Sequence, residues 1–390
     1  MLRYLTAGES HGEALTAILD GMPADLPLDS AVIERDLTRR RQGYGAGARM
    51  EIERDTVCIL GGVMGGKTTG APIALLVENA DHARWKGRPI PPMTIPRPGH
   101  ADLTGALKYG YRDLRPALER ASARETAMRV AVGAICRHFL AQFGLRLGGY
   151  VCAIGAESAD LEGLSYHERF ERSEASEMRC PDENAARRMK ASIDAAVEQG
   201  ATLGGIIEVV ALGVPAGLGA YAQWDRRLDA RLGAAVLSVP AVKGVEFGRA
   251  WESTRLLGTQ VQDAMRFEGQ TIVRLTNWAG GLEGGITNGQ PLVVRAAMKP
   301  IATTSRPQPT VNLASGEDAL SRYERSDHCP LPRAVPVLEA MLAYVLADAL
   351  IEKLGGDSLS EMQARFVTLR KPQRDDLPMD NTPHVWWEVE

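Results

Sequence analysis

The chain has 390 residues, of which 45% are hydrophobic and 24% charged, which is a globular composition and excludes a disordered or collagen-like polymer. Its formal net charge of -4 provides no general attraction for nucleic acid or for an anionic membrane, so neither is an expected partner. The five cysteines are widely spaced and include no CxxC pair, which argues against a disulfide framework and against a zinc site.

The sequence has no mark of a secreted, membrane-spanning or two-domain protein. The first eight residues lack a basic region followed by an apolar run, so we predict no secretory signal and a cytoplasmic location. The longest apolar stretch, Val335 to Leu354, is interrupted by Pro336 and by charged residues, and it indicates a buried helix rather than a membrane span. Chains of this length often divide into two domains. We find no repeat and no seam, and therefore predict one domain over 1–390 with a polar tail from about residue 371.

The hydrophobic pattern predicts a mixture of short strands and helices. In chain order these are strands at 2–6, 56–61 and 73–77, helices at 123–143 and 181–199, strands at 204–212, 271–276 and 291–299, and a helix at 337–354. The first and last helices are apolar on almost every side and are expected inside the protein, whereas 181–199 has one apolar face and is expected on the surface. The segment 287–290 predicts a hairpin turn with positive φ at Asn288-Gly289. Because regular βαβ alternation is missing, the predicted fold class is α+β.

The first candidate site is the loop Gly8-Glu9-Ser10-His11-Gly12, which follows the first predicted strand. Its spacing matches the Gly-x-Ser-x-Gly turn that carries the nucleophile of many hydrolases. That turn joins a strand to a helix in an alternating α/β chain, so we set the hydrolase interpretation aside. An isolated loop histidine is more often structural than an acid or base, and this motif alone assigns no function.

Two basic segments have the residue types that bind phosphate or carboxylate. The first is 37–50, where arginines at 39, 40, 41 and 49 surround a glycine loop, and the second is 120–129, where three arginines open the predicted helix. Arginine forks match the oxygen pairs of these anions, and free amides at a helix start add to such a site. The alternative for the first segment is a solvated basic turn.

Three further segments carry candidate residues. Arg97-Pro98-Gly99-His100-Ala101-Asp102 is a rigid turn that presents a histidine, with Asp102 available to orient its ring. The segment 280–289 has five glycines, which suggests a backbone passing close to something flat or anionic. In 325–329 an aspartate and a histidine precede the last helix, where the alternative is helix capping and a surface charge pair. No spacing predicts a metal site, a Walker loop or a dinucleotide fingerprint.

Together and in this order, these segments resemble chorismate synthases from about Tyr4 to Asp348. The motifs that carry the resemblance are 8–12, 97–102, 122–129, Ala241-Val242-Lys243-Gly244-Val245-Glu246-Phe247-Gly248, the glycine-rich segment and 333–337. The resemblance implies a sandwich of interior helices between antiparallel sheets, and a homotetramer. It also implies an anti 1,4-elimination of phosphate from 5-enolpyruvylshikimate 3-phosphate to give chorismate, a carbon–oxygen lyase reaction of aromatic amino acid biosynthesis.

The family reaction requires reduced FMN although it has no net redox change. Phosphate leaves C3 and hydrogen leaves C6, where no adjacent carbonyl acidifies it, so general base catalysis alone would be slow. The flavin lends an electron that expels phosphate and recovers it as the hydrogen leaves. A cationic site then stabilises the departing anion.

The resemblance also implies roles for individual residues. His11 matches the proton donor to the leaving phosphate, His100 the histidine that protonates the flavin, and Asp327 the acid that takes a proton from flavin N5. The positions that match FMN contacts are Arg120, Ala121, Ser122, Pro240, Ala241, Gly284, Lys299, Pro300, Ile301, Ala302, Thr303 and Arg325. The candidates for binding the substrate anions are Arg49, Arg124 and Arg129.

The source of electrons is a separate question. Arg40 and Ala46 fall where relatives bind NADPH, but relatives usually have arginine at position 46. This departure weakens the case for direct NADPH binding and favours an external flavin reductase. The competing interpretations are an FMN oxidoreductase, which would consume one reductant per product, and a non-catalytic anion-binding protein.

Overall fold

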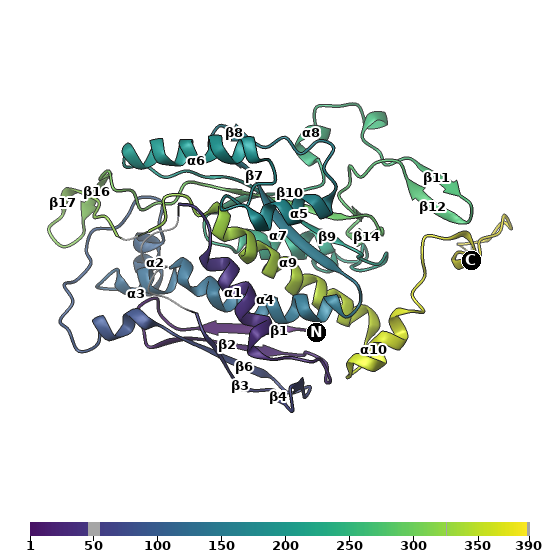
Figure 1. Ribbon diagram of the computed structural model, residues 1–390, viewed down its shortest axis with the longest axis horizontal. Coiled ribbons are helices and arrows are strands. Elements are labelled where there is room, and N and C mark those ends of the chain that lie inside the picture. Colours follow the sequence, from purple (N-terminus) through teal and green to yellow (C-terminus); the bar gives the residue numbers. More distant parts are fainter. Residues whose placement is uncertain (46–54, 325, 388–390) are drawn as a thin grey trace.

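Two antiparallel sheets enclose a layer of helices in the computed structural model, which describes residues 1–45, 55–324 and 326–387 (Figure 1). The first, here called the small sheet, has the order β1-β2-β6-β3, with β1 at Arg3–Ala7, β2 at Ala14–Asp20, β6 at Ile73–Glu78 and β3 at Val57–Gly61. The second, the large sheet, has the order β10-β15-β9-β7-β8, with β10 at Val242–Phe247, β15 at Leu292–Met298, β9 at Gly205–Leu212, β7 at Arg146–Ile154 and β8 at Glu157–Ser158.

The helices between the sheets confirm the predicted interior layer. It is formed by α1 (Ser30–Arg41), α4 (Thr126–Ala141), α7 (Leu228–Leu237) and α9 (Leu331–Leu354) (Figure 1). Helix α5 (Tyr166–Ala175) packs on the outer face of the large sheet, and α6 (Glu183–Glu198) lies beside its edge strand β8. The α+β sandwich is therefore confirmed. It follows from patterning, because α4 and α9 are apolar all round and can be accommodated only where apolar surface lies on every side.

Short elements connect these layers. The remaining helices are α2 (Asp102–Tyr109), α3 (Arg115–Arg120), α8 (Ala250–Ser253) and α10 (Leu359–Phe366), with short turns of helix at Ala80–Arg84, Ala123–Glu125, Trp224–Arg226, Gly258–Gln260 and Arg374–Asp376. The remaining strands form two-stranded pairs, β4 (Val63–Met64) with β5 (Lys67–Thr68), β11 (Met265–Glu268) with β12 (Thr271–Arg274), β13 (Leu282–Glu283) with β14 (Ile286–Thr287), and β16 (Pro309–Asn312) with β17 (Glu317–Leu320).

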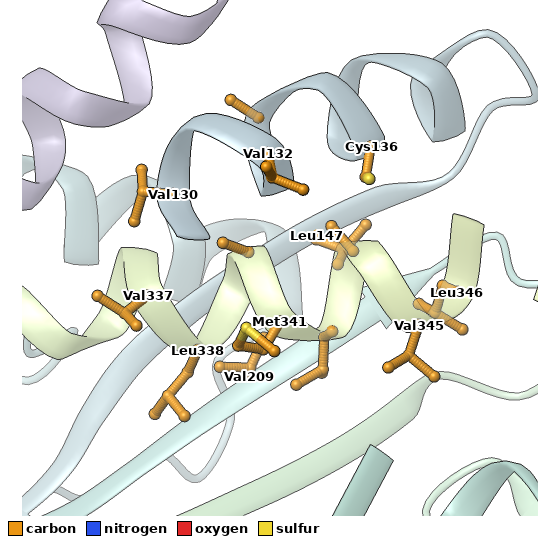
Figure 2. Packing of buried hydrophobic residues seen from close by; sticks show 14 of the residues in the cluster. Val130, Val132, Cys136, Leu147, Val209, Val337, Leu338, Met341, Val345 and Leu346 are labelled. Carbon is orange, nitrogen blue, oxygen red and sulfur yellow. The ribbon is translucent and has the colours of Figure 1, made fainter. Parts of the chain in front are cut away.

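Helices α4 and α9 form the centre of the core. Figure 2 shows α9 beside α4, with the strands that carry Leu147 and Val209 crossing next to α9. The two helices approach most closely at Gly133, where a Cβ would lie only 2.2 Å from that of Ala340. Helix α9 is long and apolar enough to cross a membrane, but 89% of its most apolar window is buried within the protein. It is the core helix that the sequence predicts.

Helix α9 begins six residues earlier than predicted, at Leu331. Pro332 lies in the first turn, where a helix needs no N–H donor, so proline is accommodated there. Pro336 also lies within the helix and does not end it. The boundary prediction placed too much weight on this second proline.

A buried ion network ties three interior helices together. Glu339 of α9 accepts from Arg39 of α1 at 2.6 Å and from Arg137 of α4 at 3.1 Å. Burial raises the pKa of Glu339, but the charges of Arg39 and Arg137 outweigh it, and the net shift is downward. Glu339 is therefore held as a carboxylate inside the core. Removing one member of such a group is costly because its partner charge stays buried.

The predicted hairpin turn at 287–290 is wrong. Strand β14 pairs with β13 and not with β15, and the turn between the paired strands is Gly284-Gly285, with φ of 59° and 82°. Two residues with positive φ are what a two-residue hairpin of this type needs, and glycine meets that need without strain. Asn288 has no positive φ. Its side chain instead donates to Glu283 at 2.9 Å and accepts from the amide of Gln290 at 3.0 Å.

Candidate active site

A cavity of about 430 Å³ lies at the end of the helix layer where α2 and α3 lie and where α4 and α9 begin (Figure 1). Its volume is within the range of small-molecule sites, ~300–1,000 Å³. The described residues that line it are Ser10, His11, Arg40, Trp85, Arg97, Gly99, His100, Ala101, Leu118, Ala121, Ser122, Ala123, Arg124, Thr126, Val239, Pro240, Ala241, Met298, Lys299, Ile301, Ala302, Thr303, Glu324, Ser326, Asp327, Pro330, Arg333, Ala334 and Val337. Five of them are arginine or lysine and two are acidic, so the lining is cationic, with an apolar wall.

His11 enters this cavity from the loop between β1 and β2. That loop joins two antiparallel strands, which confirms that it is not the strand-to-helix turn of a hydrolase. The Nδ1 of His11 lies 2.9 Å from Oε1 of Glu119, and its backbone N–H donates to Oε2 at 2.8 Å. The ring of Trp85 lies against the imidazole at a centroid distance of 4.5 Å. His11 is thereby held in one orientation at the cavity wall.

The same loop is anchored by Asn79. Its side-chain amide donates to the carbonyl oxygens of Glu9 at 3.1 Å and Gly12 at 2.9 Å. Its oxygen accepts from Nε of Arg124 at 2.9 Å. One buried amide therefore links the histidine loop to the start of the arginine-bearing helix, and the two candidate segments of the sequence form one unit.

His100 lies on a tight turn, as predicted. The amide of His100 donates to the carbonyl of Arg97 at 3.3 Å, with Pro98 and Gly99 at the turn and a φ of 77° at the glycine. Nδ1 of His100 lies 2.6 Å from Oδ1 of Asp102, which confirms that this aspartate orients the ring. Burial raises the pKa of Asp102, but the hydrogen bonds from Arg97 and His100 outweigh it and hold the pKa well below its ordinary value.

Arg40 and Arg124 reach the cavity from α1 and from the turn before α4. Both pair with the fully buried carboxylate of Asp55, and Arg40 also donates to Thr126 at 3.1 Å and to the carbonyl of Ala123 at 3.0 Å. Burial, followed by the charge of Arg333, lowers the pKa of Arg40 to about 9. The buried cluster is held together by one acid between two guanidinium groups.

Asp327 also lines the cavity and forms an ion pair with Arg333 at the start of α9, whose Nε donates to the carbonyl of Arg40 at 3.2 Å. Lys299 bridges two lining segments, because its ammonium donates to the carbonyl of Gly99 at 2.7 Å. Its backbone amide donates to Ala241 at 2.9 Å. Ala241 has a φ of 69°, a conformation that non-glycine residues rarely adopt and that is found preferentially at functional sites.

Comparison with known proteins gives a consistent family. A family model described as chorismate synthase matches residues 2–351. The chorismate synthase of Aquifex aeolicus is 51% identical over 386 residues, covering 94% of this chain and 96% of the relative, and that of Geobacter sulfurreducens is 48% identical over 383 residues, covering 94% and 98%. The chain belongs to the chorismate synthase family. A solved structure described as the crystal structure of chorismate synthase matches with a TM-score of 0.78 at 45% identity, covering 94% of this chain and 96% of that chain.

Most of the residues predicted from the family motifs lie in the cavity lining. These are His11, His100, Asp327, Arg40, Ala121, Ser122, Arg124, Pro240, Ala241, Lys299, Ile301, Ala302 and Thr303. They come from separate segments of the chain, so their convergence depends on the fold and is independent support for the assignment. Their individual roles stay predictions.

Four predicted residues that the structure describes do not line this cavity: Arg120, Arg129, Gly284 and Pro300. Arg120 donates to the carbonyl of Thr6 at 2.9 Å and to that of Gly8 at 3.2 Å, and so anchors the end of β1 and the start of the histidine loop. Arg129 pairs with Glu125 at 2.9 Å and with Ser238 at 2.7 Å. Gly284 lies in the β13–β14 turn. The predictions for Ala46, Arg49 and Arg325 lie outside the described residues.

Sequence reasoning missed four groups that shape the site: Glu119, Asn79, Asp55 and Trp85. Glu119 directly precedes the arginine motif at 120–129 and was overlooked because its partner lies 108 residues away. Asp55 has a φ of 52°, an unusual conformation that no sequence signal reveals. Asn79 and Trp85 lie between the family motifs at 8–12 and 97–102, in a segment that contains no recognised motif.

Proposed function

We propose that this protein forms chorismate by eliminating phosphate from 5-enolpyruvylshikimate 3-phosphate, with reduced FMN bound in the described cavity. The observation that carries the proposal is the convergence of His11, His100 and Asp327 on one cationic cavity. The substrate has a phosphate and two carboxylates, and a site with an excess of guanidinium and ammonium groups suits such an anion. We further propose that the enzyme acts in the cytoplasm and as a homotetramer.

The cavity fits a flavin as well as the substrate. Its apolar wall includes Val239, Pro240, Met298 and Val337, and such a wall suits the planar ring. Lys299 lies beside this wall and its ammonium suits the phosphate of FMN. When bound, reduced FMN supplies the electron that assists phosphate departure and regains it as the C6 hydrogen leaves.

The two histidines have separate tasks in this proposal. Nδ1 of His11 is bound to a carboxylate, which leaves Nε2 as the nitrogen that can donate a proton to the departing phosphate. Nδ1 of His100 is likewise bound to Asp102, and this pair keeps the ring oriented toward the bound cofactor. Asp327, paired with Arg333 and also in the cavity lining, is the proton acceptor in this proposal.

The arginines stabilise negative charge in place. Arg124 and Arg40 are both paired with Asp55, which holds their guanidinium groups in place before a ligand binds. Charges that are already oriented need little reorganisation as the phosphate anion forms. Position 46 is alanine where relatives usually have arginine, so we propose an external flavin reductase and not direct NADPH binding as the electron source.

The proposal is tested anaerobically with dithionite-reduced FMN and the enolpyruvyl substrate, by following the ultraviolet absorbance of the diene and the release of phosphate. His11→Ala is expected to abolish phosphate release while flavin stays bound. His167→Ala changes a histidine on α5 that lies outside the cavity lining and serves as the control. Unchanged activity in His11→Ala would remove His11 from the mechanism, and consumption of one reductant per product would instead identify an oxidoreductase.

A further inference from the structure

Glu119 binds the histidine loop more extensively than any residue of the recognised motifs does. Its carbonyl oxygen accepts from the amide of Ser10 at 3.2 Å, and its carboxylate accepts from the amide of His11 at 2.8 Å and contacts Nδ1 at 2.9 Å and 3.1 Å. The Glu119 side chain is 11% exposed. A single residue at the end of α3 thus holds both the backbone and the ring of His11.

The chemistry of these contacts determines which ring nitrogen carries hydrogen. Burial raises the pKa of Glu119, but the hydrogen bonds and charge of His11 outweigh it, and the net shift is downward. An ionised carboxylate can only accept hydrogen bonds, so Nδ1 of His11 must be the donor. Nε2 is then the nitrogen available to a ligand in the cavity, and it bears a transferable proton when the ring is cationic.

Neighbouring groups restrict the ring further. Arg115, one turn before Glu119 on α3, pairs with Glu119 at 3.7 Å and lies over the ring of Trp85 at 5.5 Å. Trp85 in turn lies against His11. The carbonyl of His11 accepts from Nδ1 of His82 at 3.0 Å. Glu119 and Trp85 therefore contact the imidazole directly, and His11 also lines the cavity.

We propose that Glu119 is a positioning residue that sets the tautomer and orientation of His11. The proposal rests on the proposed function, in which His11 donates a proton to the leaving phosphate. The bond between Nε2 and hydrogen breaks, the phosphate oxygen gains the proton, and the ring returns to its neutral Nδ1–H form. Glu119 itself stays ionised throughout and does not touch the substrate.

The test is Glu119→Gln, which keeps the shape of the side chain and removes its charge. We expect kcat to fall on the order of 100-fold, the range lost with one general acid, while KM changes only a few-fold. The amide of glutamine can donate to Nδ1 as well as accept from it, so it no longer fixes which ring nitrogen carries hydrogen. Glu119→Asp retains the charge with less reach and is expected to recover part of kcat.

Glu246→Gln is the matched control. Glu246 is 9% exposed, accepts from a backbone amide at 2.8 Å and pairs with Arg295, but it lies outside the cavity lining. It is expected to keep the parental kcat. A Glu119→Gln enzyme with parental kcat, or a Glu119→Asp enzyme that recovers none of the lost kcat, would overturn the proposal.

A second measurement does not depend on a folded variant. In parent protein labelled with ¹⁵N-histidine, neutral His11 is expected to give the chemical shifts of the Nδ1–H tautomer, and shifts of the Nε2–H tautomer would overturn the proposal. If the parent itself forms no chorismate from substrate and reduced FMN, the proposed function fails. That result is distinguishable, because the ¹⁵N measurement reports on the Glu119 contact alone.

Discussion

The substitution Gly133→Ala tests how closely the two central helices pack. A Cβ at position 133 would lie 2.2 Å from Cβ, 2.4 Å from Cα and 2.8 Å from the carbonyl oxygen of Ala340. None of these atoms can rotate away, so α4 and α9 would have to move apart. Overpacking costs about 1–3 kcal/mol, and the overlap with backbone atoms places this site at the upper end. Replacing a helical glycine returns about 1 kcal/mol, so we expect a net loss of roughly 2 kcal/mol of unfolding free energy.

The same substitution in α7 is the matched control. Gly233 is also a buried helical glycine, but the nearest atom to an added Cβ is a methyl carbon of Val245 at 3.8 Å, an ordinary contact. Gly233→Ala is therefore expected to gain about 0.4–1 kcal/mol. Urea unfolding followed by circular dichroism should lower the midpoint for Gly133→Ala and raise it for Gly233→Ala. A midpoint for Gly133→Ala at or above that of the parent would refute the reasoning.

Three further substitutions have defined outcomes. Glu339→Gln leaves the buried guanidinium of Arg39 without its main counter-charge and is expected to cost about 3 kcal/mol in urea unfolding. Glu183→Gln, at a carboxylate that is 90% exposed and pairs with the 65% exposed Arg187, should cost less than about 1 kcal/mol; equal losses would contradict this. Because the pKa of Asp102 lies below its ordinary 3.8, this carboxylate stabilises the fold above that pH and stops doing so as the pH falls further. The stability difference between the parent and Asp102→Asn should therefore close at acid pH, and a constant difference would argue against it. Gly99→Ala places a side chain on a φ of 77° and should lower stability by about 1–2 kcal/mol, seen as a lower thermal midpoint; an unchanged midpoint would show that the turn tolerates the strain.

Local patterns were sufficient to predict much of the architecture. Helices α4 and α9 were placed inside the protein because they are apolar on nearly all sides, and the observed layer agrees. The pairing of His100 with Asp102 was also accessible, since the two residues are neighbours on one turn. The hairpin turn was mispredicted at 287–290 because Asn-Gly pairs favour such turns. The actual turn is at Gly284-Gly285, a few residues earlier.

The sequence by itself predicted six of the strands, the two central helices α4 and α9 and the family that the motifs resemble, because these depend on residue type and short spacing. It did not predict strands β2, β7 and β10 or the interior helices α1 and α7. Only the tertiary structure decided that Glu119 holds His11 and that Asp55 pairs with both Arg40 and Arg124. It also decided that Arg129 is not among the residues that line the cavity. Contacts between residues so far apart in the chain depend on how the two sheets close over the helices. No local propensity encodes that closure, since it is the sum of burial over the whole core.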